Sequence, residues 1–220
     1  MRLLPTFSLA GALIACALVT AASPATASVL TGGTRFYAAG VPGSGASADY
    51  VSNWNALAAS PPTGGYADVS MTDWGSVQNP GGSHSNIATH YQALFYAGAA
   101  GLWTFRTSFD SGWGGTMLAD GVELQTRSTD MWWNGDWSDP AQHLEGSLSL
   151  SVGNHVLDIY GLEGCCDGPG QGQFSGPATG GFRTFSTEDG LAAVPEPISL
   201  AILTLGVAGL GVVRNRRHGR

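Results

Sequence analysis

The alternation of apolar and polar residues at every second position is the feature that most constrains this fold. In the segment 102–109, the aromatic residues Trp103, Phe105 and Phe109 share one side, whereas polar residues share the other. Such alternation puts one set of side chains into a core and the other toward water. The segment predicts a β-strand with one buried face, and the pattern over 87–96 favours another.

A second alternating segment predicts a β-hairpin over 146–160. Leucine or valine at positions 148, 150 and 152 alternates with serine, and the inward set resumes at Leu157 and Ile159. Between them stands Gly153-Asn154, a pair that can adopt the positive φ that two-residue hairpin turns require.

The rest of residues 28–193 also lacks a convincing helical pattern. The chain has 33 glycines and 11% charged residues, and its short apolar runs are separated by Gly, Pro, Asn and Ser. This pattern is typical of a sandwich or barrel of strands. The segment 40–65 is predicted to be a loop with one helical turn near 54–58, 77–86 a second loop, and 181–186 a strand.

The N-terminus has the parts of a secretory signal peptide. One positive charge at Arg2 precedes an apolar run through Val19, and Ala25-Thr26-Ala27 forms an A-x-A cleavage site. We expect signal peptidase to cut after Ala27. The alternative is a lipobox ending at Cys16, but the apolar run continues past that residue, which favours the plain signal peptide.

The C-terminus predicts a single membrane-spanning helix. An apolar run over 198–213 would be about 24 Å long at ~1.5 Å per residue, which is marginal for a bilayer core of about 30 Å. Arginines follow it, and such a cluster stays on the cytoplasmic side, which places everything upstream across the membrane. The elements in order are Val194, Pro195, Glu196, Pro197, the apolar run, and then Arg214, Arg216 and Arg217.

The net charge of residues 28–193 limits which partners the domain is expected to bind. Residues 28–193 contain 15 acidic residues and 4 arginines, and the whole chain has no lysine. This field repels a phosphate backbone, so nucleic acid is excluded as an expected partner. The length is that of one domain with a real core.

The order of Pro-Glu-Pro, short apolar helix and arginine cluster resembles the PEP-CTERM sorting signal of Gram-negative bacteria. The resemblance implies a signal peptide at 1–27, a domain at 28–193 and a sorting signal at 194–220. It also implies that an exosortase cuts near the motif, that 198–213 anchors the chain transiently in the inner membrane, and that the protein then reaches the cell surface or the extracellular space.

A second resemblance lies in the middle of the chain. The segments 101–112 and 117–124 resemble the centre of a PA14-type domain, an antiparallel β-sandwich. Together with Asp130–Trp133 and Gly161–Gly168, they also resemble the CCXG group of PEP-CTERM proteins. The resemblance implies a PA14-like β-sandwich and assigns no activity. Residues 28–86 match no signature.

Asp110 and Asp120 both lie at predicted turns, in Asp110-Ser111-Gly112 and Asp120-Gly121. As turn residues, their carboxylates would accept backbone N–H groups. As ligands, they would hold Ca²⁺, which takes several oxygen atoms. Some PA14-type lectins use two adjacent aspartates for calcium, whereas this sequence has Asp110-Ser111. Ca²⁺ is therefore an optional ligand here, and no cofactor is required.

Cys165 and Cys166 are the only cysteines left once the signal peptide is removed. In an oxidising compartment, two thiols without other partners usually pair. Adjacent Cα atoms are only ~3.8 Å apart, so the pair would be strained. We favour a vicinal disulfide that stiffens a turn. Free thiols, an intermolecular bond and metal ligation are the alternatives.

Trp132, Trp133 and Trp137, together with Asp136, form an aromatic and acidic loop. Indole faces stack on sugar rings and carboxylates accept hydroxyl groups, which is typical of a carbohydrate-binding surface. A long loop over a sandwich also folds its tryptophans inward as a lid, and the sequence alone leaves both interpretations open.

Three classes of function follow. The favoured one is a non-catalytic protein associated with extracellular polysaccharide. The second is a glycoside hydrolase in which Glu163 and either Asp130 or Asp136 supply the acid and the base, although nothing in their spacing fixes their geometry. The third is a purely structural envelope protein. No nucleophile elbow, metalloprotease motif or phosphate loop is present, so we predict that the protein is not an enzyme.

Overall fold

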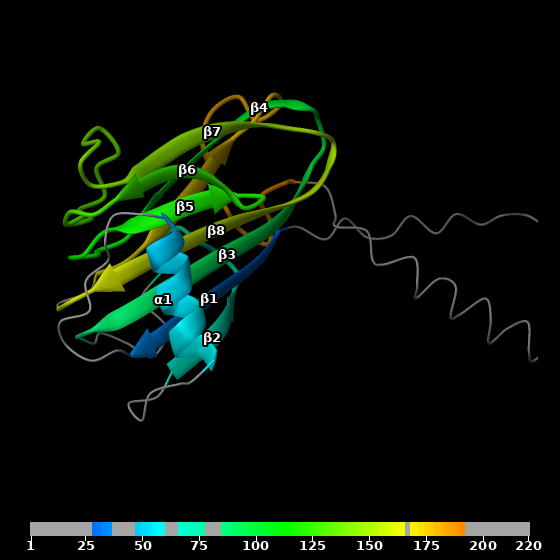
Figure 1. Cartoon of the computed structure of the whole chain (residues 1–220). Helices are drawn as coiled ribbons and strands as arrows, with labels where there is room; N and C mark the ends of the chain where they lie inside the picture. Colours follow the sequence, from blue (N-terminus) through cyan, green and yellow to red (C-terminus); the bar gives the residue numbers. More distant parts are fainter. Residues whose placement is uncertain (1–27, 37–46, 60–65, 78–84, 166–167, 192–220) are drawn as a thin grey trace, which may run out of the picture.

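The chain folds into two antiparallel β-sheets packed face to face. The computed structural model describes residues 28–36, 47–59, 66–77, 85–165 and 168–191, and within them the strand orders are β2-β1-β3-β8-β5-β6 and β10-β9-β4-β7 (Figure 1). The elements are β1 (Val29–Phe36), α1 (Ser47–Ala59), β2 (Tyr66–Met71), β3 (Ile87–Ala97), β4 (Gly101–Ser108), β5 (Gly115–Ala119), β6 (Val122–Arg127), β7 (Leu144–Leu150), β8 (Gly153–Glu163), β9 (Gln171–Ser175) and β10 (Arg183–Thr184). The predicted all-β antiparallel architecture is confirmed.

An aromatic core lies between the two sheets. Trp103 and Phe105 of β4 are buried, as their alternation predicts, and Phe95 of β3 meets them with ring centroids 5.8 and 5.6 Å away. Phe174 of β9 and Phe185 pack in the same cluster at 4.7 Å. Full burial of such a side chain stabilises the fold by about 1.5–3 kcal/mol, so this cluster holds the two sheets together.

Both long sides of the sandwich are joined. On one side, the backbone N–H of Glu145 in β7 donates to Gln125 Oε1 of β6 at 2.6 Å. On the other side, the Trp74 N–H donates to the Phe185 carbonyl and the Gly172 N–H donates to the Trp74 carbonyl, both at 2.9 Å. These contacts cover strand edges that would otherwise be open to pairing with other chains.

The predicted hairpin over 146–160 is wrong, although both of its strands exist. β7 pairs with β4 in the four-stranded sheet, whereas β8 pairs with β3 and β5 in the six-stranded sheet. The chain crosses between the sheets at 151–152, and Val152, predicted to point inward, is exposed. Alternation shows which face of a strand is buried, but it does not identify the neighbouring strand.

The predicted loop over 40–65 contains a full helix instead of one turn. α1 has 13 residues and lies across the outer face of the six-stranded sheet (Figure 1). Tyr50 and Trp54 are buried beneath it and Leu57 packs beside them. The spacing i, i+4, i+7 is helical, but only these three larger apolar residues carry it, so glycine- and proline-rich neighbours obscured the signal.

Within the described residues, no helix is long and apolar enough to cross a membrane. The predicted signal peptide at 1–27 and the predicted membrane helix at 198–213 lie outside the described residues, as does most of the predicted loop over 77–86.

Candidate ligand-binding site at one end of the sandwich

Three segments meet at one end of the sandwich: 109–114 after β4, 128–143 after β6, and the described residues 164–165 and 168–170 after β8. An isolated antiparallel bridge joins the first two, with Ser111 and Met131 exchanging backbone hydrogen bonds of 3.0 and 3.1 Å. The Trp113 N–H donates to the Leu162 carbonyl at 3.0 Å and ties the first loop to β8. Segments far apart in the sequence therefore form one surface.

The bridge places Asp110 and Trp132 side by side. In an antiparallel pair, the residue before one member lies opposite the residue after the other, and neighbouring side chains point to opposite faces. Ser111 and Met131 are buried, whereas Asp110 is half-buried and Trp132 is exposed, so the bridge register sets these two residues on the face of the loops opposite to Ser111 and Met131. The Trp132 side chain is strongly exposed, at 62%. We call this pair the Asp110–Trp132 platform.

The loop that contains Cys165, which we call the cysteine-containing loop, borders this platform. A Cβ atom built on Gly168 would lie 3.0 Å from Asp110 Oδ2, so the Asp110 side chain packs closely against Gly168. Cys165 is the last described residue before the gap at 166–167. Because Cys166 lies outside the described residues, the predicted Cys165–Cys166 disulfide stays a prediction.

Glu163 lies beneath the platform and connects two of the loops. Its side chain is buried, with 3% of the residue exposed. Oε2 accepts the Gly112 N–H at 2.6 Å, and Oε1 accepts the Cys165 N–H at 2.6 Å. Burial raises the pKa of Glu163, the backbone N–H groups of Cys165, Gly112 and Gly164 oppose that shift, and the negative charge of Asp130 adds to it.

This geometry gives little support to the hydrolase alternative. A general acid must reach the substrate with its proton, whereas Glu163 is buried and both of its oxygens accept backbone N–H groups. Asp136 is fully exposed and accepts hydrogen bonds from Ser138, which lower its pKa. A lowered pKa suits a turn carboxylate more than a proton donor.

Trp133 and Trp137 fold inward over the four-stranded sheet. Trp133 is buried, and its ring lies 4.4 Å from that of Trp137. The guanidinium of Arg106 is held between Trp137 and Phe182, 4.3 and 3.8 Å from the two ring centroids. These two tryptophans therefore act as a lid, and of the three in the loop Trp132 alone is strongly exposed.

Asp120 lies at the other end of β5 from Asp110. The five residues of β5 span roughly 17 Å at about 3.3 Å each, so the two carboxylates cannot hold one ion. Within the described residues, no group of three or more His, Cys, Asp or Glu side chains is placed to hold a metal ion. The calcium hypothesis that joined these two residues does not fit this geometry.

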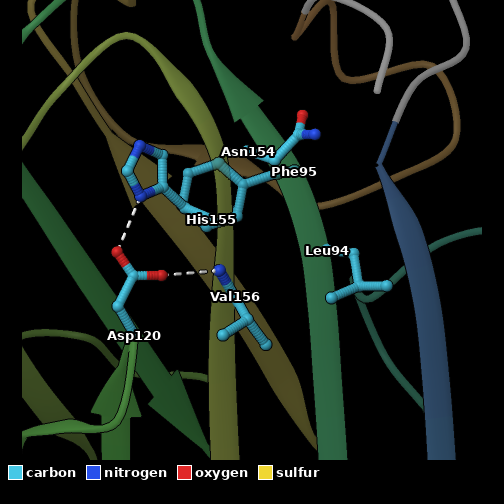
Figure 2. A pocket seen from close by; sticks show the side chains of 6 residues that line it. All are labelled: Leu94, Phe95, Asp120, Asn154, His155 and Val156. Atoms are coloured by element: carbon cyan, nitrogen blue, oxygen red, sulfur yellow. Dashed lines mark hydrogen bonds and ion pairs between the residues drawn. The ribbon is translucent and has the colours of Figure 1, made fainter. Parts of the chain in front are cut away.

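The surroundings of Asp120 are a regular hairpin turn. Asp120 and Gly121 have φ of +49° and +76° and join β5 to β6 as a two-residue turn with both φ positive. The carboxylate accepts the Val156 N–H at 3.0 Å and contacts His155 Nδ1 at 2.7 Å (Figure 2). Both of these partners of the carboxylate belong to the neighbouring strand β8, whereas the sequence predicted hydrogen bonds within the turn itself.

A pocket of about 360 Å³ opens at this second end. Figure 2 shows Asp120 directed at His155 and at the backbone nitrogen of Val156 rather than into open space. Asp120 is thus bonded to His155 and Val156, and the pocket walls are mostly apolar. Its lining consists of Leu94, Phe95, Asp120, Asn154, His155 and Val156.

Sequence reasoning found the segments of the candidate site but not their arrangement. The segments 101–112, 130–133 and 161–168 were singled out by their resemblance to one protein group, and the structure brings their ends together. The pairing of Asp110 with Trp132 was missed, because it depends on a bridge between residues 20 positions apart. No local pattern in the sequence marks this pairing.

Comparison with known proteins identifies the C-terminal end. Residues 193–217 match the family model described as the PEP-CTERM protein-sorting motif. The chain carries a PEP-CTERM sorting signal. This signal implies processing by an exosortase and export to the cell envelope or surface. No curated protein sequence shows significant similarity to the chain.

Solved structures resemble the domain. The PA14 domain of the MpAFP antifreeze protein is 14% identical, with a TM-score of 0.50 over 76% of this chain and 92% of that one. A PA14 sugar-binding domain from an RTX adhesin is 15% identical over 76% and 98% of the chains, with a TM-score of 0.49. The epithelial adhesin 9 A domain from Candida glabrata is 10% identical over 79% and 96%, with a TM-score of 0.46. The first of these shows a PA14-like fold and nothing about function.

Proposed function

We propose that this protein is a non-catalytic, exported surface protein that binds extracellular polysaccharide through the Asp110–Trp132 platform. The observation that carries the proposal is the exposed indole of Trp132, held beside a carboxylate by ordered loops. The sorting motif supports a location where such polymers occur.

The chemistry of the platform fits a sugar. A large exposed aromatic face gains free energy when it is covered by the C–H groups of a sugar ring. An adjacent carboxylate accepts sugar hydroxyl groups and fixes their orientation. Trp113, in the loop that contributes Asp110, is also exposed and adds apolar surface at this end.

Charge narrows the kind of polysaccharide. The domain has 15 acidic residues against 4 arginines, and the field of such a surface repels polyanions. We therefore infer a neutral polysaccharide rather than an acidic one. Trp133, Trp137 and Asp136 support the site as parts of the lid and do not contact the ligand.

The export route is part of the same proposal. Signal peptidase cuts after Ala27, the helix at 198–213 anchors the chain transiently in the inner membrane of a Gram-negative bacterium, and an exosortase releases the domain near Val194–Pro197. A Cys165–Cys166 disulfide stiffens the loop beside the platform. No metal is required.

A glycan array probed with the exported protein tests the binding. We expect neutral glycans to bind, and Trp132→Ala to weaken binding about tenfold or more, which corresponds to about 1.4 kcal/mol. Leu102→Ala is the matched control, because Leu102 is also 62% exposed but lies on the four-stranded sheet. Retained binding in Trp132→Ala, or hydrolysis of any glycan, would contradict the proposal. Repetition with EDTA shows whether Ca²⁺ contributes.

A further inference from the structure

We propose that Glu163 is a positioning residue that holds the Asp110–Trp132 platform in its binding geometry by joining loop 109–114 to the cysteine-containing loop. This inference deepens the proposed function and rests on it for the ligand. The joint itself is a property of the protein without ligand, so it is tested separately below.

The joint consists of one carboxylate between two backbone segments. Glu163 is the last residue of β8, and its two oxygens accept N–H groups from Gly112 and Cys165, each at 2.6 Å. Oε1 would also lie 3.0 Å from a Cβ atom built on Gly112. A glycine at this position therefore lets the backbone approach the carboxylate closely.

Only an ionised carboxylate satisfies both donors. A carboxylate accepts hydrogen bonds at both oxygens, whereas a protonated acid or an amide presents a donor on one side. In this buried place that donor would face the N–H of Gly112 or Cys165, and a buried donor without an acceptor is costly. Glutamine, although nearly the same size, cannot reproduce the joint.

The position of the platform depends on Gly112. Gly112 follows Ser111, whose bridge with Met131 sets Asp110 beside Trp132. If Gly112 loses its acceptor, the segment 110–113 keeps the bridge to Met131 and its bonds to the Leu162 carbonyl, but it loses the connection through Glu163 to the loop that contains Cys165. Asp130, opposite Gly112 in the bridge register, is a charged side chain that acts on Glu163, and its negative charge opposes ionisation there.

Glu163→Gln tests this inference, with Glu123→Gln as the matched control because Glu123 is exposed on β6. The first measurement is amide hydrogen exchange of the exported protein without ligand. We expect exchange at Gly112 and Cys165 to accelerate at least tenfold in Glu163→Gln and to stay unchanged in Glu123→Gln. Unchanged exchange at both amides would overturn the inference, whether or not any glycan binds.

The second measurement is the pH profile of glycan affinity. Burial raises the pKa of Glu163. As the pH is lowered, the glycan affinity of the wild type should therefore begin to fall at a higher pH than it would if an exposed glutamate controlled it. Glu163→Gln should be weak and flat across the same range. A purely stabilising role would lower the unfolding temperature and leave the pH profile of the folded protein unchanged. A variant profile equal to that of the wild type contradicts positioning.

If Glu163→Gln does not fold, the wild type alone is sufficient. The Gly112 and Cys165 amide resonances should then shift with one common midpoint as Glu163 is titrated. Two unrelated midpoints, or no shift, would overturn the inference.

Discussion

The two ends of β5 carry an aspartate each, and their surroundings differ. Asp120 lies in a regular hairpin turn, where Val156 and His155 bind its carboxylate. Asp110 lies in an irregular loop beside an exposed tryptophan, and two other loops border it. Binding residues are disproportionately found on loops that a rigid scaffold positions, and the end that carries Asp110 has in Trp132 a strongly exposed aromatic side chain on such a loop. We therefore assign stability to the first end and binding to the second.

Glycine substitutions give the largest contrast between the two ends. A Cβ atom on Gly161 would overlap the Phe109 ring, so Gly161→Ala should destabilise the fold by about 3 kcal/mol through overpacking. Gly121 has open space and only a positive φ, so Gly121→Ala should cost about 1 kcal/mol. Urea unfolding measures both, and equal losses would contradict this packing difference.

The aspartates themselves should separate stability from binding. Asp120→Ala removes two hydrogen bonds and should lower the free energy of unfolding by about 2 kcal/mol without changing glycan affinity. Asp110→Ala should weaken glycan binding about tenfold. Chemical unfolding and titration calorimetry on both variants check this, and a loss of affinity in Asp120→Ala would reverse the assignment of the two ends.

Tyr50 of α1 stabilises the end of the sandwich that carries the Asp110–Trp132 platform. Its hydroxyl donates to the carbonyl of Trp113 or Arg127, 2.8 and 2.9 Å away. Tyr50→Phe should cost about 1–1.5 kcal/mol.

Burial raises the pKa of Tyr50 to about 12, so its contribution is complete below pH 10 and is lost as pH rises toward 12. The difference in stability between wild type and Tyr50→Phe should therefore shrink over that range. A constant difference would mean that the hydroxyl is not held in this way.

A substitution beneath the lid that Trp133 and Trp137 form should have the smallest effect on the stability of the protein. Arg106 stacks between Trp137 and Phe182 and donates to Gln173 Oε1 at 2.7 Å. Lysine keeps the charge but loses the planar stack, so Arg106→Lys should destabilise the protein by about 1 kcal/mol. Thermal unfolding and tryptophan fluorescence measure this, and an unchanged unfolding temperature would show that the lid does not depend on the stack.

The sequence predicted single strands better than their arrangement. The strands at 87–96 and 102–109 follow from alternation, because burial on one face leaves a direct mark. The partner of β7 leaves no such mark, so the hairpin over 146–160 was wrong. Helix α1 was missed because three apolar residues carry its buried face. The Asp110–Trp132 platform could not be predicted, since one bridge between distant loops creates it.

Binding at the Asp110–Trp132 platform is tested most directly by an NMR titration of the exported protein with fragments of a neutral polysaccharide. We expect the indole N–H resonance of Trp132 to shift on binding, while those of Trp133 and Trp137 and the ring of His155 change little. Shifts confined to His155 and the Asp120 turn, or no shift at Trp132 with a fragment that binds, would contradict binding at this platform.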